Sequence, residues 1–253
     1  MATKKRPQTV LIASDVHIPE HDRRAWKAFL LLAKDARPDY IVLAGDFLEL
    51  HSVSQHGAFN RELLNEDLAH GRQAIEAIKT AAPKAKIVYL EGNHETRLPR
   101  FLAAKAPSLE GTLDLQKGLK LREYDVTWVT ETQQPWSKGC LDVIHGHQMP
   151  GKHGPKHHAA RMTELYGAPK RVVVYGHTHK AQTHTAPGLS GIKTAVGLGC
   201  MRTLQPSWLH GANAGWSHGF AVAELSASGR VSVYPVPVVD GYIYWHGKAY
   251  DGR

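Results

Sequence analysis

Cysteine is scarce in this sequence, with Cys140 and Cys200 the only two among 253 residues. Two cysteines give no disulfide framework of the kind that small secreted scaffolds use. The pair could in principle form one bond, but in an intracellular chain both are expected to stay reduced. Sites that depend on several thiolate ligands are therefore not indicated.

Long apolar runs, internal repeats and low-complexity tracts are also missing. No apolar run is long enough to cross a bilayer, so no membrane partner is expected. Residues 1–7, with Lys4, Lys5 and Arg6, lack the apolar segment of a signal peptide and suggest a flexible basic leader. We therefore expect a cytoplasmic protein whose remaining residues, 8–253, form a single domain.

Charge is abundant and unevenly distributed. The formal net charge is +8, and residues 146–180 hold six Lys or Arg against one acid, Glu164. This distribution favours an anionic substrate or partner, with nucleotide or nucleic acid as candidates. A solvated basic surface is the simpler alternative. Seventeen histidines are more than expected by chance, and many stand near the candidate ligands described next.

Five short apolar runs each end in residues that can bind metal. The runs are 9–13, 41–44, 87–90, 141–144 and 172–175, and the residues that follow them are Asp15, His17, Asp46, Asn93, His145, His177 and His179. Asp46 follows Gly45 and is placed at the centre of the site, because a carboxylate has two oxygens and can bridge two cations. Ligands at the carboxyl ends of parallel strands are where such sheets usually build sites.

The order of elements indicates an α/β fold. Three strands are expected, ending before Ser14, Gly45 and Glu91. Between them lie two helices, one capped by Asp22 and ended by Pro38, and one from about Arg61 to Ala82. This alternation of strands and helices predicts that the strands pair in parallel. A mostly helical stretch is expected at 97–109 and an extended one at 119–130. The later strands, 141–145, 171–175, 182–186, 191–198, 219–225 and 231–238, are expected to form a second sheet packed on the first, with helix only around 158–165.

The stretch 197–220 is too rich in Gly, Pro and Trp for regular structure and is expected to be a long ordered loop. It has two interpretations, a functional loop or a packing lid fixed by Trp208 and Trp216. The loop 146–158, with Lys152, His153, Lys156, His157 and His158, could close over an anionic substrate or lie free on the surface. His51 and His56 have the same ambiguity.

The conjunction of Asp15-x-His17, Gly45-Asp46, Gly92-Asn93-His94-Glu95, His145 and Gly176-His177-x-His179 resembles the calcineurin-like metallophosphoesterase superfamily. The region from Cys200 to Phe220 is similar to phage- or prophage-borne members. The resemblance implies a four-layer sandwich of two mixed β-sheets flanked by helices, with two divalent metals in one cleft. One metal would be held by Asp15, His17 and His179, and the other by Asn93, His145 and His177, with Asp46 bridging.

Mixed imidazole and oxygen ligands suit Mn, Fe, Zn, Co or Ni better than Ca or Cu(I), and Mn is preferred here. Two such cations about 4 Å apart can share a hydroxide and bind phosphoryl oxygens during in-line attack. By the resemblance, His94 would protonate or stabilise the leaving group. Arg97 and His147 are candidate substrate contacts alongside Asn93, although an Arg on a helix surface is an equal alternative. Glu95 could orient a neighbouring group or hold the turn, and the structural role is preferred.

The predicted function is phosphodiester hydrolysis. Protein serine/threonine phosphatases of the superfamily carry Gly where this chain has Ile18, and acid-Arg-Gly where it has Glu49-Leu50-His51, which disfavours a phosphoprotein substrate. A phosphomonoesterase or phosphoprotein phosphatase remains the alternative. A non-catalytic scaffold of the same fold and a nucleic-acid-binding module are less favoured, because every ligand position is filled and no recognition motif is visible. The oligomeric state does not follow from the sequence.

Overall fold

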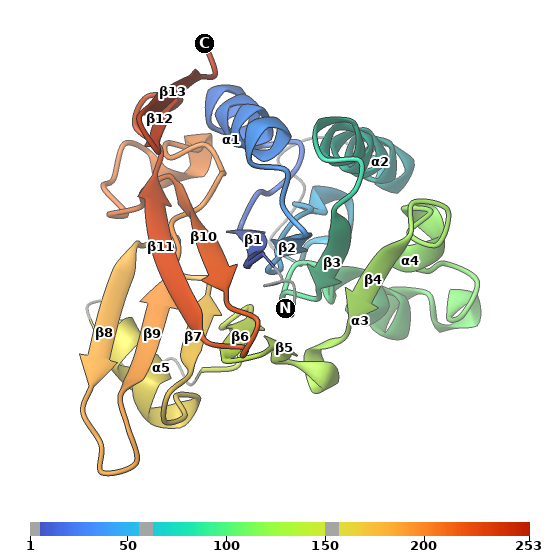
Figure 1. Cartoon of the computed structure of the whole chain (residues 1–253). Coiled ribbons are helices and arrows are strands. Elements are labelled where there is room, and N and C mark those ends of the chain that lie inside the picture. The colour runs from blue at the N-terminus through green and yellow to red at the C-terminus, as the bar shows by residue number, and fades with distance from the viewer. Residues whose placement is uncertain (1–5, 56–62, 150–156) are drawn as a thin grey trace.

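The computed structural model describes residues 6–55, 63–149 and 157–253 (Figure 1). Its first sheet has the order β11-β10-β1-β2-β3-β4. The central strands β1 (Gln8–Ala13), β2 (Tyr40–Leu43), β3 (Lys86–Leu90) and β4 (Val126–Val129) run parallel. The strands β10 (Gly219–Leu225) and β11 (Val231–Pro237) complete the sheet in antiparallel pairing, so the sheet is mixed.

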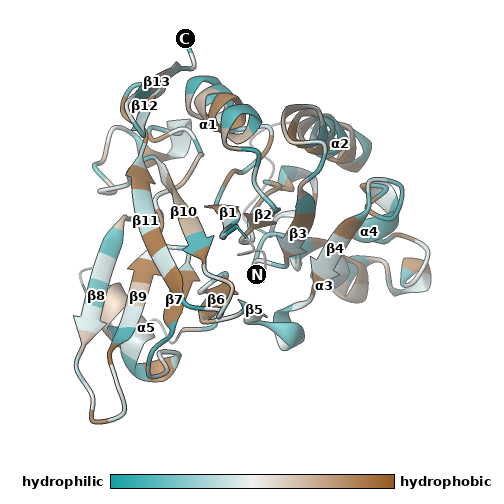
Figure 2. Cartoon of the chain, viewed as in Figure 1, coloured by the Kyte–Doolittle hydropathy of each residue, from teal (hydrophilic) through white to brown (hydrophobic). Residues whose placement is uncertain are grey.

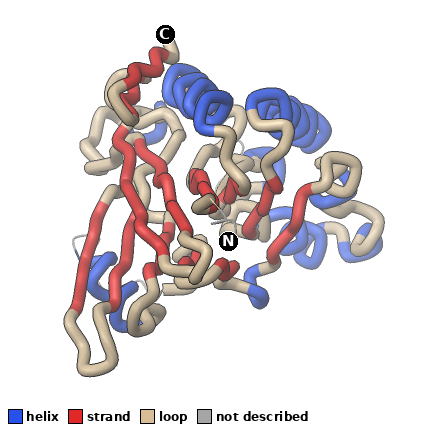
Figure 3. The backbone as a smooth tube through the Cα atoms, in the orientation of Figure 1, coloured by secondary structure: helices blue, strands red, loops and turns tan. Residues whose placement is uncertain are grey.

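The second sheet has the order β5-β6-β7-β9-β8 and is also mixed. Its parallel core is β6 (Leu141–Ile144), β7 (Val172–Tyr175) and β9 (Lys193–Gly197). The edge strands β5 (Trp136–Lys138) and β8 (Gln182–Ala186) pair antiparallel to β6 and β9. A separate hairpin, β12 (Tyr242–Trp245) with β13 (Lys248–Asp251), lies beside α1 at the C-terminal end of the chain (Figures 1 and 3).

Five α-helices flank the sheets in the described part of the chain. They are α1 (Arg23–Ala36), α2 (Leu64–Ala81), α3 (Arg97–Lys105), α4 (Leu115–Gly118) and α5 (His158–Leu165). Asp22 caps α1 as predicted, since its side chain accepts the N–H groups of Arg24 and Ala25. The predicted start of α2 at Arg61 lies outside the described residues, as do residues 1–5. Arg6 of the predicted leader pairs with Asp39 at 2.7 Å.

Three apolar layers define the architecture. Alternate residues of β2 point to opposite faces, so Ile41 and Leu43 pack with the α1 and α2 side while Val42 and Ala44 pack against the second sheet. A third cluster joins Val173 and Tyr175 of β7 to Met162 of α5. The order helix, sheet, sheet, helix confirms the predicted four-layer sandwich. Hydrophobic residues are accordingly prominent in strands such as β7 and β9, whereas the edge strand β8 is mostly hydrophilic (Figure 2).

Two topological predictions were wrong. Residues 219–225 and 231–238 were assigned to the second sheet, but they form β10 and β11 of the first, where β10 pairs with β1. β10 is buried on both faces, with Phe220 toward the helices and Ala221 toward the second sheet, so its pattern alone does not distinguish the sheets. The extended stretch 119–130 reduces to β4, and the strand β5 was not predicted. No described helix is long and apolar enough to cross a membrane.

Candidate metal centre

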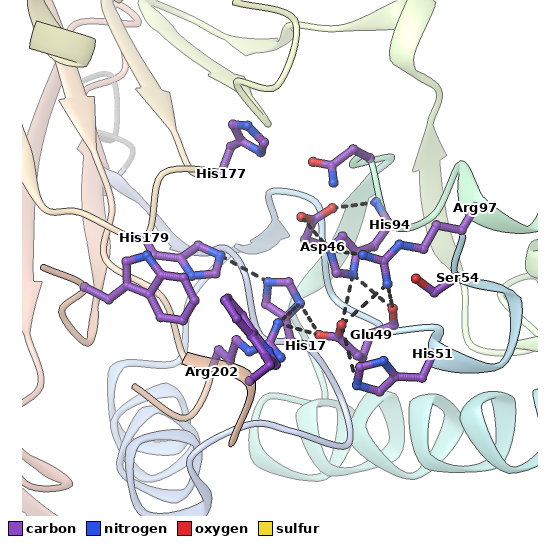
Figure 4. Close-up of a pocket in the computed structure, with 13 residues that line it drawn as sticks. His17, Asp46, Glu49, His51, Ser54, His94, Arg97, His177, His179 and Arg202 are labelled. Atoms are coloured by element: carbon purple, nitrogen blue, oxygen red, sulfur yellow. Dashed lines mark hydrogen bonds and ion pairs between the residues drawn. The ribbon is translucent and has the colours of Figure 1, made fainter. Parts of the chain in front are cut away.

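The candidate site lies where the carboxyl ends of five parallel strands meet. Asp15 and His17 follow β1, Asp46 follows β2 and Asn93 follows β3, whereas His145 follows β6 and His177 and His179 follow β7. The two sheets are joined here by the backbone N–H of His177, which donates to Asp15 Oδ2 at 2.8 Å. All seven predicted ligands are therefore brought to one region, which Figure 4 shows for Asp46, His17, His177 and His179.

Glycines in the predicted motifs allow the backbone to approach the carboxylates. A Cβ atom on Gly92 would stand 2.3 Å from Asp46 Oδ1, and one on Gly176 would stand 2.4 Å from Asp15 Oδ2. Neither distance is sterically possible, so both positions require glycine while the carboxylates keep these places. Glu95 holds the adjacent turn as expected, since its buried carboxylate accepts the N–H groups of Asp46 and Gly92 at 2.9 and 2.8 Å.

Five of the seven predicted ligands have left-handed backbone conformations. Their φ angles are 53° for Asp15, 55° for His17, 49° for Asp46, 66° for His177 and 57° for His179. This conformation is uncommon for residues other than glycine, although Asp and His tolerate it better than most. Such strained residues cluster at functional sites, because the surrounding structure has to hold them in place.

Asp15, His17 and His179 form the first candidate metal group. Their ligand atoms lie within 4.8 Å of one another, and all three residues are buried. His179 Nε2 is 3.2 Å from Asp15 Oδ1 and 3.1 Å from His17 Nε2. Asp15 Oδ1 is buried without a hydrogen bond of normal geometry. A buried carboxylate oxygen in this state fits a position that a cation would fill.

Asp46, His145 and His177 form the second group, again with ligand atoms within 4.8 Å. His145 Nε2 is 3.3 Å from Asp46 Oδ1 and 3.2 Å from Asn93 Oδ1, so the Asn93 side chain joins this group. The other ring nitrogen, Nδ1, lies 2.8 Å from the Ala44 carbonyl, to which it donates. That bond leaves Nε2 free as a ligand atom, which is the usual arrangement of metal-bound histidine.

The pKa values show how these groups hold charge when no cation is present. Burial alone would lower the pKa of His145, but the neighbouring Asp46 carboxylate raises it to about 9. Burial would also lower the pKa of His179, but the neighbouring Asp15 carboxylate raises it to about 10. The pKa of Asp46 is held well below its usual value, because His145 and His94 outweigh the effect of burial. The donor set of carboxylate, imidazole and amide fits a dinuclear centre.

His94 and Arg97 form a coupled pair beside the two groups. His94 Nδ1 donates to the Glu49 carbonyl at 2.9 Å, and Arg97 donates to His94 Nε2 at 2.8 Å. Because the guanidinium can only donate, this arrangement requires a neutral His94. Burial lowers the pKa of His94 to about 4, against the opposing charge of Asp46, which agrees with that state. Arg97 also donates to the Glu49 carbonyl at 2.7 Å.

A buried ion-pair network next to the first group was missed by the sequence analysis. Glu49 Oε2 accepts from His17 Nδ1 and from Arg202, both at 2.7 Å, and Arg202 also pairs with Glu20, which in turn contacts His51. Burial raises the pKa of Glu49 to about 7, although Arg202 and His51 oppose the shift. Glu49 was noted only as a departure from the phosphatase pattern. Nothing in the sequence links Arg202 to it, 153 positions away.

The two candidate metal groups open onto a cavity of about 530 Å³. His17, Asp46, Asn93, His177 and His179 lie on its metal side, and the remaining lining residues are Glu49, His51, Ser54, His94, Arg97, Arg202, Trp208 and Trp216. The last three come from the loop between β9 and β10. The predicted long loop at 197–220 therefore contributes side chains to the site.

The other predicted substrate contact, His147, lies beside the cavity. Its ring centre is 5.2 Å from that of His145 and 6.2 Å from that of His177, and its Nε2 is 3.0 Å from Glu131. It does not line the cavity. His56, Lys152, His153 and Lys156 lie outside the described residues, so neither interpretation of the loop 146–158, closure over a substrate or a free surface loop, is tested. His157 and His158 stand at the start of α5.

Comparison with known proteins agrees with this geometry. The sequence model of the calcineurin-like phosphoesterase family matches residues 8–181. The "Gene 54 protein" of Mycobacterium phage D29 is 25% identical over 256 residues, covering 96% of this chain and 98% of the phage protein. The protein of the same name from Mycobacterium phage L5 is also 25% identical, with the same coverage of both chains. Phage relatives thus span nearly the whole chain, as the resemblance at residues 200–220 predicted.

Two solved structures show similar chain arrangements at low identity. Vacuolar protein sorting 29 from Cryptosporidium parvum is 16% identical, with a TM-score of 0.43 over 98% of this chain and 96% of that chain. A dimetal phosphatase from Danio rerio is 13% identical, with a TM-score of 0.42 over 92% of this chain and 99% of that chain.

Proposed function

This chain belongs to the calcineurin-like phosphoesterase family, and from that premise we propose that it hydrolyses phosphodiesters at a centre of two divalent metal ions. The supporting observation is the convergence of seven ligand-type side chains from two sheets on one cavity. Nucleotides or nucleic acid are the proposed substrate class, in keeping with the basic segment 146–180.

Each ion would have its own set of ligands in this proposal. One ion is assigned to Asp15, His17 and His179, and the other to Asn93, His145 and His177. Asp46 is assigned to both, since its Oδ1 contacts His145 and its side chain lies between His177 and His17 in Figure 4. Manganese is the first choice because no thiolate is among these donors, with Fe, Zn, Co and Ni as alternatives.

When bound, a pair of divalent ions supplies Lewis-acid stabilisation of phosphoryl oxygens and an activated water nucleophile. The chain's own residues then bind the substrate and handle the leaving group. Arg97 presents its guanidinium at the cavity and would donate to a phosphate oxygen. If Arg97 turned to the phosphate, His94 Nε2 would lose its present donor, and it could then take a proton from solvent water and pass that proton to the leaving oxygen. Asp46 Oδ2, 3.8 Å from Nε2, would stabilise the protonated ring.

A diester is favoured over a monoester by the shape of the cavity. Besides the metal groups, its lining includes His51 and Ser54 and the indoles of Trp208 and Trp216. Its volume of about 530 Å³ is far more than a phosphate group needs, and it is typical of sites that hold small organic ligands. Two substituents on the phosphorus atom can therefore be accommodated.

Activity of the manganese-loaded protein tests this function. Bis(p-nitrophenyl) phosphate and p-nitrophenyl phosphate would be compared at equal concentration, and we expect the diester to have the higher kcat/KM. Activity should disappear on chelation and return with Mn²⁺. A preference for the monoester would support the phosphomonoesterase or phosphoprotein phosphatase alternative. Protein that binds two equivalents of metal yet cleaves neither ester, nor any nucleotide or nucleic acid, would support a non-catalytic role.

A further inference from the structure

The side of the cavity away from Arg97 is aromatic. In Figure 4, His179 and Arg202 lie on one side of Asp46, and Arg97 and Ser54 lie on the other. Trp216 packs against His179 with ring centres 4.5 Å apart, and Trp208 lies over the Arg202 guanidinium at 5.6 Å. The two indoles contact each other edge to face at 5.7 Å. Together they form a continuous aromatic wall beside the first candidate metal group.

The base of this wall, at Arg202, is anchored by residues in and beside the first candidate metal group. The backbone N–H of Arg202 donates to the Asp15 carbonyl at 3.2 Å, and the Arg202 side chain is bound by Glu49 and Glu20. His218, near the end of the loop, donates to the Arg202 carbonyl at 2.8 Å. Arg202 is only 3% exposed, so the base of the wall is as buried as the ligands, whereas Trp208 is 39% exposed at the cavity mouth. Arg202 therefore connects the base of the wall to Asp15 and Glu49.

An aromatic wall beside a phosphate site selects the group attached to the phosphorus. Quaternary ammonium groups also bind to indole faces, but here the Arg202 guanidinium already lies over the Trp208 ring and would repel a second cation there. A neutral planar group stacks without that repulsion, and nucleobases stack on Trp whatever their sequence. His51 and Ser54 also line the cavity and offer polar groups to a bound substrate.

We propose that Trp208 and Trp216 form a nucleobase-binding wall, and that the substrate is a phosphoester that presents one unpaired base next to the reacting phosphate. The proposal rests on the proposed function for the position of the phosphate. A base stacked on this wall would lie inside the cavity, whose volume of about 530 Å³ is typical of sites for one small organic ligand, so it would not be paired with a complementary strand. Free nucleotides and single strands fit this requirement, and duplexes do not.

Binding calorimetry on the Mn²⁺-loaded protein tests the wall without depending on turnover. The probes are AMP and ribose 5-phosphate, which share the sugar and the phosphate and differ by the base. We expect AMP to bind about tenfold more tightly than ribose 5-phosphate, in line with one stacked base. Trp208→Leu should remove that advantage and leave ribose 5-phosphate unchanged, and Trp208→Phe should keep most of it. Trp245→Leu, on the C-terminal hairpin and outside the cavity lining, is the matched control.

Equal affinity for AMP and ribose 5-phosphate would overturn the proposal, as would a Trp208→Leu variant that weakens both probes equally. If Trp208→Leu does not fold, Trp216→Leu with Trp216→Phe serves the same comparison. A short single-stranded oligonucleotide should displace AMP, and the same strand in a duplex should not. Hydrolysis without base preference would refute the wall alone. Base-dependent binding without hydrolysis of any ester would refute the proposed function alone.

Discussion

The two sides of the cavity are built in different ways. The metal side comes from the ends of five strands in two sheets, where a backbone hydrogen bond to Asp15 and glycines that admit no side chain hold Asp15, Asp46 and His145 in place. The aromatic side comes from one loop between β9 and β10. Strand ends give a geometry that tolerates little change, whereas a loop can change its side chains without altering the sheets. We infer that the metal side determines the reaction and the loop determines which phosphoester is used.

Glu49 connects the two sides. Its carboxylate binds His17 on the metal side and Arg202 at the base of the loop, each at 2.7 Å. The comparison therefore predicts that activity or binding falls most for a change at Asp46, less for changes at His94 and Glu49, and least for a change at Arg97.

The largest effect is expected for Asp46→Asn. Replacing the Asp46 carboxylate removes the negative charge beside His145. It also removes the ligand proposed to be shared by the two ions, so metal binding and activity should be lost together. We expect activity on a model diester to fall on the order of a thousandfold or more. Metal content by mass spectrometry and steady-state kinetics check this. Asp35→Asn, which alters an exposed carboxylate paired with Lys248, should change neither.

His94→Ala should separate metal binding from turnover. The ring contacts the Glu49 carbonyl and Arg97 and is not assigned to either ion, so both metals should stay bound. The rate should fall about a hundredfold for a substrate with a poor leaving group and less for nitrophenolate, which needs no proton. Full activity on the poor leaving group would show that the assigned role is wrong. His246→Ala, at the C-terminal hairpin, is the control.

Glu49→Gln should weaken both the metal side of the cavity and the anchoring of the loop that carries Arg202. Glutamine keeps the shape but not the charge, so His17 is oriented less firmly and Arg202 is left less neutralised. Metal affinity should fall about tenfold, as for other partners of ligating histidines. A titration of apo-protein with Mn²⁺ measures the change. Unchanged metal affinity would contradict the connecting role of Glu49. Glu123→Gln, an exposed substitution, should have no effect.

Arg97→Met should have the smallest effect and should fall on substrate binding. It removes one charge-assisted contact to phosphate, which corresponds to about a tenfold rise in KM. Arg100→Met, one turn along the same helix on its exposed side, should leave KM unchanged. If both variants behave alike, Arg97 acts only as a general surface charge.

The metal side could be predicted from the sequence because each part of it is local. A short apolar run followed by Asp15, Asp46 or His177 encodes both the strand and the residue at its end, and parallel strands bring those ends together. The family match over residues 8–181 supports the same motifs.

The aromatic side could not be predicted in this way. Arg202, Glu49 and Glu20 meet through long-range pairing, and no periodic pattern marks the positions of a loop. The placement of β10 beside β1 was missed for a related reason, since a run such as Phe220 to Leu225 reports burial on both faces but not the identity of the neighbouring strand. Loop residues and sheet order depend on tertiary contacts that local sequence does not contain.

A left-handed backbone lowers the stability of the fold but is the conformation in which the candidate ligands reach the site. It occurs at Asp15, His17, Asp46, His177 and His179. Glycine would relieve a conformational cost of roughly 1 kcal/mol at each such position. A variant such as His177→Gly is therefore expected to melt at a higher temperature than the native metal-free protein, although it has given up a ligand. Bound cations would offset this conformational cost, because ions that bind only the folded protein stabilise it.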